Sequence, residues 1–168
     1  MKAIGIVIAV VAALALQTTL ARYVRGSAAV DLVLVVVVYV ALTYGPVAGL
    51  MTGTIGGLVQ DAMTTGVLGI GGLAKTVVGF LAGIIGTQFI VTQSLPRFLV
   101  FFAATLLHSL VFVGLYVLLD LRHFGTPYTA AVGQAAGNAA VGVVAFQLVE
   151  LLPGAVERRR AAKSQFRR

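Results

Sequence analysis

Long stretches without a charged side chain dominate this sequence and restrict what it can fold into. Residues 3–20 and 98–119 contain no Asp, Glu, Lys or Arg. Of all 168 residues, 60% are hydrophobic and 10% are charged, whereas about 25% of a soluble domain is charged. A single soluble core of this size leaves much of its surface in water, so a lipid bilayer must cover the apolar exterior. Hydrocarbon admits only helices or closed β-barrels, and continuous apolar runs favour helices. The sequence therefore predicts an all-α integral membrane protein.

Six apolar segments predict a bundle of six transmembrane helices, because about 20 apolar residues cross the hydrocarbon of a bilayer. The expected spans are 3–20, 28–44, 47–59, 73–90, 98–119 and 130–152. The third segment is short for a span, which leaves two interpretations: a short buried helix or one arm of a re-entrant hairpin. Glycine and proline mark the expected breaks, at Gly45-Pro46, 60–72, 92–97 and Pro153-Gly154. We expect one transmembrane domain over residues 1–153, followed by a basic tail over residues 154–168.

Positive charge gathers near the C-terminus. Six of the twelve Lys and Arg residues occupy the last eleven positions, namely Arg158, Arg159, Arg160, Lys163, Arg167 and Arg168. Basic residues that flank membrane spans concentrate on the cytoplasmic side, so both termini are predicted to be cytoplasmic. The first four of these side chains are expected to anchor the topology and to contact anionic lipids. Nucleic-acid binding is not indicated, because the charge belongs to a tail and not to a folded face.

Glycine recurs at helical spacing in three of the expected helices. The residues are Gly49, Gly53 and Gly57 in the third segment, Gly79 and Gly83 in the fourth, and Gly133 and Gly137 in the sixth. Small residues four apart share a helix face and allow another backbone to approach closely. These faces are predicted either to pack the bundle together or to receive a helix of a partner protein.

Two charged residues flank the glycine-rich turn between the third and fourth segments. Asp61 and Lys75 are candidates for an ion pair at one membrane face, because ionisable groups at membrane depth usually pair or face the protein interior. The alternative is that Asp61 caps a helix that starts near Thr64, while Lys75 extends to water. Asp31, near the start of the second segment, is expected to cap that helix.

Three further polar residues lie within expected spans: His108 in the fifth, and Gln134 and Asn138 in the sixth. They are predicted either to form hydrogen bonds between helices or to line a polar pocket. The sequence contains no Cys, and it shows no nucleophile–base pair, cluster of metal ligands or nucleotide-binding loop. We therefore expect no enzymatic activity, no cofactor and no metal.

Several short motifs follow one another in a distinctive order. They are Gln17-Thr18-Thr19-Leu20, Asp31-Leu32-Val33-Leu34, Tyr44-Gly45-Pro46-Val47-Ala48-Gly49, Gly56-Gly57-Leu58-Val59-Gln60-Asp61, Gly66-Val67-Leu68-Gly69 and Leu73-Ala74-Lys75-Thr76-Val77-Val78-Gly79-Phe80-Leu81-Ala82-Gly83, with Asn138 in the last span. This order resembles the MreD family of rod shape-determining proteins, over nearly the whole chain. The chain departs from the family pattern at Val30, where proline is usual, and at Thr43 and Tyr44, where the family is often basic.

The resemblance implies a subunit of the bacterial cell-elongation machinery in the inner membrane that is not an enzyme. Its implied partners are the single-span protein MreC and, through MreC, the glycosyltransferase RodA with its transpeptidase and the MreB cytoskeleton. The family is also similar to the substrate-binding subunits of energy-coupling-factor vitamin transporters, which have six helices and a pocket on the outer side. We therefore expect a membrane scaffold that supports cell-shape control and lateral peptidoglycan synthesis. The alternative function is substrate binding in a small-molecule transporter.

Overall fold

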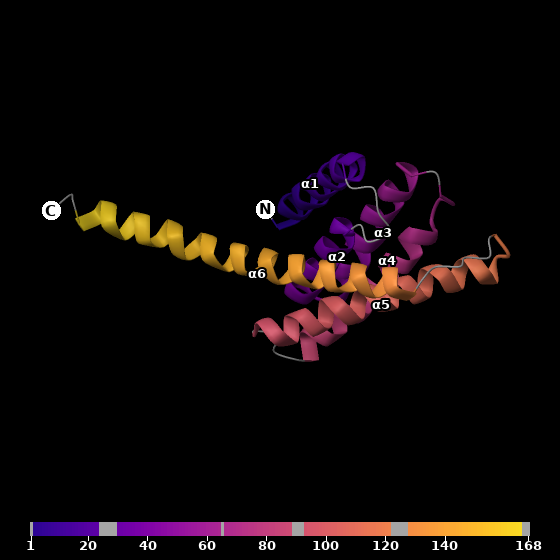
Figure 1. The fold of residues 1–168 in the computed structure, drawn as a ribbon. Coiled ribbons are helices and arrows are strands. Elements are labelled where there is room, and N and C mark those ends of the chain that lie inside the picture. Colours follow the sequence, from indigo (N-terminus) through magenta and orange to yellow (C-terminus); the bar gives the residue numbers. More distant parts are fainter. Residues whose placement is uncertain (1, 24–29, 65, 89–92, 122–127, 166–168) are drawn as a thin grey trace.

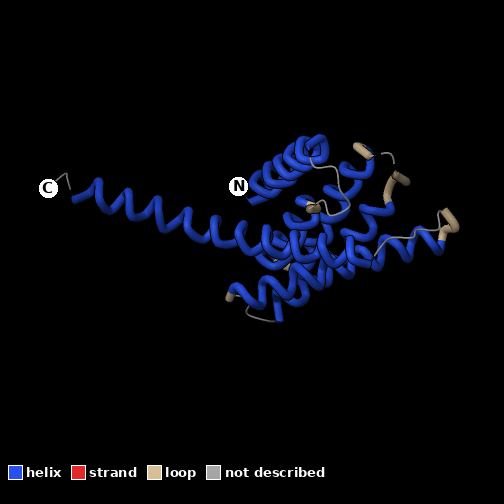
Figure 2. The backbone as a smooth tube through the Cα atoms, viewed as in Figure 1, coloured by secondary structure: helices blue, strands red, loops and turns tan. Residues whose placement is uncertain are grey.

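The computed structural model describes residues 2–23, 30–64, 66–88, 93–121 and 128–165, without the side chains of residues 2, 20–23, 128 and 152–165. Within these ranges the chain forms six α-helices and no β-strand, as Figures 1 and 2 show. The helices are α1 (Lys2–Tyr23), α2 (Leu32–Tyr44), α3 (Pro46–Ala62), α4 (Ile70–Gln88), α5 (Ser94–Leu118) and α6 (Tyr128–Gln165). The prediction of an all-helical protein is confirmed.

Helix α2 lies at the centre of the bundle and contacts each of the other five helices (Figure 1). Seven of its 13 residues are buried, and five of these seven are valine. Valine is a weak helix former in water, but a buried backbone must satisfy its own N–H and C=O groups, and a helix does so. Gly45 ends α2 with a φ of 91°, a conformation that favours glycine. Pro46 starts α3 immediately afterwards, so α3 turns back alongside α2.

Helices α3 and α4 pack backbone against backbone. A Cβ atom built on Gly53 would lie 2.7 Å from the backbone carbonyl carbon of Lys75, and one built on Gly49 would lie 2.9 Å from that of Gly79. Real Cβ atoms essentially never approach other heavy atoms this closely. We call this contact the glycine seam. Its members are Gly49, Gly53 and Gly57 of α3 and Gly72, Gly79 and Gly83 of α4.

The exterior of the bundle is apolar. Large hydrophobic side chains remain exposed on α1 and on α3 to α6, for example Ile8, Met51 and Leu118. Among the described residues, three helices are long and apolar enough to cross a membrane, namely α4, α5 and the Thr129–Leu151 part of α6. An exposed apolar surface of this extent would aggregate in water, whereas lipid solvates it. The arrangement fits a helical membrane protein.

Several helix ends differ from the expected boundaries. Helix α2 begins only after Asp31, whose side chain caps it, so its 13 residues extend about 20 Å and not the length expected for 28–44. Helix α4 begins at Ile70, so Gly71 and Gly72 belong to a helix and not to the expected turn over 60–72. Helix α5 begins at Ser94 within the expected loop over 92–97, because proline, here Pro96, is tolerated in a first helical turn.

The last helix does not end where the sequence indicated. Helix α6 continues through Pro153 and Gly154 to Gln165, so the predicted break and the separation of a tail at residue 154 are not seen in the backbone. An internal proline removes one backbone hydrogen bond and can bend a helix without ending it. The residues that follow are mostly Ala, Arg, Glu, Lys and Gln, which are strong helix formers.

Candidate functional site

The first element of the site is the cap of α2. The Oδ1 atom of Asp31 accepts a hydrogen bond from the backbone N–H of Leu34 at 3.0 Å, which confirms the predicted cap. The other carboxylate oxygen of Asp31 forms a salt bridge with Lys75 Nζ at 2.8 Å. Both side chains are almost completely buried, with 6% and 3% of their surface exposed. Asp31 therefore both starts α2 and ties it to α4.

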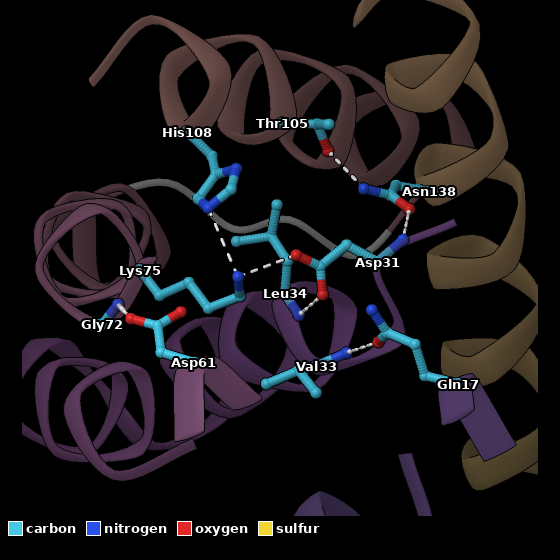
Figure 3. A network of polar contacts seen from close by, with 10 residues as sticks. All are labelled: Gln17, Asp31, Val33, Leu34, Asp61, Gly72, Lys75, Thr105, His108 and Asn138. Atoms are coloured by element: carbon cyan, nitrogen blue, oxygen red, sulfur yellow. Dashed lines mark hydrogen bonds and ion pairs between the residues drawn. The ribbon is translucent and has the colours of Figure 1, made fainter. Parts of the chain in front are cut away.

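Lys75 reaches this position from the second turn of α4. Its ammonium group also lies 3.3 Å from Nε2 of His108, on α5 (Figure 3). An ammonium group has three donors and no acceptor, so Nε2 of His108 must accept this hydrogen bond. The imidazole is then neutral, with its proton on Nδ1. Lys75 thereby joins α2, α4 and α5 at one point.

Helix α6 joins the same group of side chains through Asn138. Its Oδ1 atom accepts a hydrogen bond from the backbone N–H of Asp31 at 2.8 Å, and its amide nitrogen donates to Thr105 Oγ1 at 3.1 Å. The hydroxyl group of Thr105 donates in turn to the carbonyl of Phe101 at 2.9 Å. Asn138 and Thr105 are each 1% exposed. We call Asp31, Lys75, Thr105, His108 and Asn138 the polar centre; it links α2, α4, α5 and α6 (Figure 3).

Asp61 has a different role from the expected ion pair with Lys75. Its Oδ2 atom accepts hydrogen bonds from the backbone N–H groups of Gly69 at 2.9 Å and Gly72 at 3.0 Å. These N–H groups belong to the start of α4, where a helix has free donors and a positive dipole end. The capped helix begins at Ile70 and not near Thr64. Lys75 pairs with Asp31 instead.

A cavity of about 340 Å³ adjoins the polar centre. Asp31, Lys75 and His108 line one part of it. Among the described residues, no Cα atom of α4 lies within 8 Å of a Cα atom of α6, yet both helices contribute to the wall of the cavity. The other polar lining residues are Gln60, Asp61, Thr64, Ser109 and Gln134. Apolar surface comes mainly from Phe112 and Val113 of α5 and from Ala130 and Ala131 of α6.

The structure places the predicted polar residues around this cavity. His108 and Gln134 line it, and Asn138 lies in the polar centre beside it. The sequence analysis assigned Asp31 only a capping role and did not identify Thr105. A signal for Asp31 was present, because an acid at the start of a buried valine-rich helix needs a partner inside the protein. Thr105 gave no such signal, since threonine is common in apolar helices.

The predicted glycine faces differ in their environment. Five of these seven residues, from Gly49 to Gly83, lie in the glycine seam, so α3 and α4 cover each other's glycine faces. In α6, Gly133 is exposed, and a Cβ built on Gly137 would approach Val30 to 3.1 Å. The basic side chains Arg158, Arg159, Arg160 and Lys163 lie outside the described side chains.

A second ion pair joins α5 to α6 away from the polar centre. The guanidinium of Arg97 donates two hydrogen bonds to the carboxylate of Glu150, one of them at 3.0 Å. It also lies 4.5 Å from the ring centre of Phe146. Arg97 is buried, but the side chain of Glu150 is 56% exposed. Within the described ranges, no group of three or more His, Cys, Asp and Glu residues gathers to bind a metal ion.

A comparison with protein families finds a match over most of the chain. The family model described as rod shape-determining protein MreD matches residues 2–152. The matched range contains the entire polar centre, the glycine seam and the cavity lining. Neither the curated proteins nor the solved structures gave a match to the chain.

Proposed function

This chain belongs to the MreD family of rod shape-determining proteins, and we propose that it is a non-catalytic membrane scaffold of the bacterial cell-elongation complex. In this role it binds MreC and supports cell-shape control and lateral peptidoglycan synthesis, with RodA, its transpeptidase and MreB as more distant partners. The family match over residues 2–152 carries the proposal. The apolar exterior and the burial of Asp31, Lys75 and Arg97 support it, because a scaffold within the bilayer needs lipid-compatible outer faces.

The proposed topology places six helices across the cytoplasmic membrane, with both termini on the cytoplasmic side. The starts of α2 and α4 then face outward, so the polar centre and its cavity lie toward the outer surface. The short helix α2 is flanked by longer neighbours, which lets it remain buried without spanning the full hydrocarbon thickness. Helix α3 is longer, and its exposed side chains Val47, Met51 and Ile55 face lipid in this topology. The basic residues near the C-terminus contact anionic lipids of the inner leaflet.

The glycine seam leaves α3 and α4 with no free glycine face for MreC, so we place the partner helix elsewhere. A shallow groove of about 80 Å³ runs between α4 and α5. Three alanines contribute to it, Ala82, Ala103 and Ala104, and the rest of its lining is Val, Leu and Ile. Small residues allow a transmembrane helix to approach closely, and lipid provides no hydrophobic drive that would replace such packing. We therefore place the single span of MreC against this groove.

The test is purification of the tagged chain from its own membranes in mild detergent, with mass spectrometry of the proteins that accompany it. Recovery of MreC is the expected result. Ala103→Leu, at an exposed position in the groove, should reduce that recovery several-fold, while Ala140→Leu on an exposed face of α6 should not. Recovery of an ATPase module without MreC would overturn the scaffold role.

The cavity supports a second candidate function, that of a substrate-binding subunit in a small-molecule transporter. Its volume of about 340 Å³ falls within the range of ligand pockets, and apolar walls with a few convergent polar groups are typical of such pockets. Native mass spectrometry of gently purified protein would distinguish the two functions. A bound small molecule together with a transport ATPase favours the transporter; the absence of both leaves the scaffold.

A further inference from the structure

The cavity beside the polar centre adjoins a hydrogen-bond acceptor that lacks a donor. The Oε1 atom of Gln60 is buried and has no hydrogen-bond partner among the described residues. Gln60 lies in the last turn of α3, and its neighbour Asp61 also lines the cavity. A buried acceptor without a donor costs free energy, which an occupant with an N–H group would recover once the Gln60 amide turned toward the cavity.

The charges of the lining also favour a donor. Two carboxylates, those of Asp31 and Asp61, and one ammonium group, that of Lys75, face the cavity. Lys75 is paired with Asp31, so these two charges offset each other. Asp61 accepts hydrogen bonds only from backbone N–H groups among the described residues, and these carry no net charge. The described lining therefore carries one unbalanced negative charge.

We propose that this cavity binds a cationic hydrogen-bond donor, an ammonium or guanidinium group carried on a short apolar stem. The cation lies near Asp61 and Gln60, and the stem contacts Phe112, Val113 and the two alanines of α6. The group belongs either to a free amine or to a basic side chain of a partner protein. This inference depends on the cavity alone and holds whether or not MreC binds the groove between α4 and α5.

The absence of cysteine from the sequence allows a direct measurement. Ser109→Cys places a single thiol in the cavity lining, and Gln93→Cys places one at an exposed site outside it. Each purified full-length variant is treated with 2-ammonioethyl methanethiosulfonate and with its anionic 2-sulfonatoethyl counterpart. We expect the ratio of cationic to anionic reaction rates to be roughly tenfold higher in the cavity, because an unbalanced charge that lines the same partly buried cavity has an effect of that order.

Two charge changes test the assignment to Asp61. Asp61→Asn, made in the Ser109→Cys protein, keeps an acceptor for the N–H groups of α4 but removes the charge. The ratio of cationic to anionic reaction rates at the cavity cysteine should then fall close to the ratio measured for Gln93→Cys. Thr64→Lys adds a cation at an exposed position of the lining and should have the same effect, which keeps the test valid if Asp61→Asn fails to fold. Equal ratios at the two cysteines, or a high cavity ratio that survives both changes, would overturn the proposal.

Protection experiments identify the source of the cation. Ethylammonium chloride at high millimolar concentration should slow the labelling of Ser109→Cys, whereas ethanol at the same concentration should not. If co-expressed MreC also protects the thiol, the cation is a side chain of that partner; if only ethylammonium protects, the occupant is a free amine. Protection by neither would show that the cavity does not bind cations.

Discussion

The glycine seam and the polar centre hold helix α4 in two different ways, and Lys75 takes part in both. Its backbone carbonyl group faces Gly53 of α3, while its side chain extends to Asp31 and His108. The seam acts through shape, because any Cβ atom would overlap the opposite backbone. The polar centre acts through charge and hydrogen bonds among buried side chains. The seam thus sets how close α4 lies, and this position decides which carboxylate Lys75 can reach.

The largest effect is expected from breaking the buried ion pair. Lys75→Met keeps the length of the side chain but leaves the carboxylate of Asp31 buried without a cation. Removing one member of a buried pair typically costs about 3–5 kcal/mol, a large part of the stability of a domain. Thermal unfolding in mild detergent should show a much lower midpoint and reduced accumulation in membranes.

The double variant Asp31→Asn with Lys75→Met is the matched control. Asparagine can still cap α2, and no unpaired charge remains, so much of the lost stability should return. If Lys75→Met alone unfolds at the wild-type temperature, the salt bridge does not hold α4 to α2.

A slightly smaller effect is expected from filling the glycine seam. Gly53→Leu places a side chain against the backbone of Lys75 and Thr76, and overpacking of this kind costs about 1–3 kcal/mol, sometimes more. It should also move Lys75 away from Asp31, so its cost should not add to that of Lys75→Met in the double variant. Gly114→Leu is the control, because a Cβ at Gly114 meets nothing within 4 Å. Equal melting temperatures for the two leucine variants would contradict the close contact.

The seam and the polar centre differ in how far the sequence predicts them. Glycines four apart share a helix face whatever the fold, so the packing residues of α3 and α4 follow from local periodicity. The partner of Lys75 does not follow from local periodicity, because Asp31 and Asp61 are both acids near helix ends. Only the packing of α2 between α4 and α6 brings Asp31 within reach of Lys75. Tertiary contacts also determine the helix ends. For example, the carboxylate of Asp61 accepts a hydrogen bond from the N–H of Gly72 and so stabilises a start of α4 at Ile70.

Within the polar centre, Asn138 should matter less than the ion pair. Asn138→Leu has a similar size but leaves the backbone N–H of Asp31 without an acceptor, whereas the hydroxyl of Thr105 still donates to Phe101. An unsatisfied buried polar group costs about 1–3 kcal/mol, so the unfolding midpoint should fall by less than in Lys75→Met. Thr105→Val removes the hydroxyl that accepts from Asn138 but keeps the hydrogen bond between Asn138 and Asp31. It therefore serves as the milder comparison. A larger loss for Thr105→Val than for Asn138→Leu would place the main link between α2 and α6 elsewhere.

The smallest effect is expected at the ion pair between Arg97 and Glu150. Its hydrogen bonds are bidentate, like those of strong pairs, but the carboxylate is mostly exposed and is not held by other groups of the described chain. Glu150→Gln keeps an acceptor for Arg97, and Arg97 retains its contact with Phe146, so the unfolding midpoint should barely change. The measurement is thermal unfolding of two single variants, Glu150→Gln and Asp31→Asn. The first removes a carboxylate charge from an exposed ion pair, and the second removes one from a buried ion pair. If the two variants lose equal stability, burial does not distinguish the ion pairs, and the polar centre holds the helices mainly through its neutral hydrogen bonds.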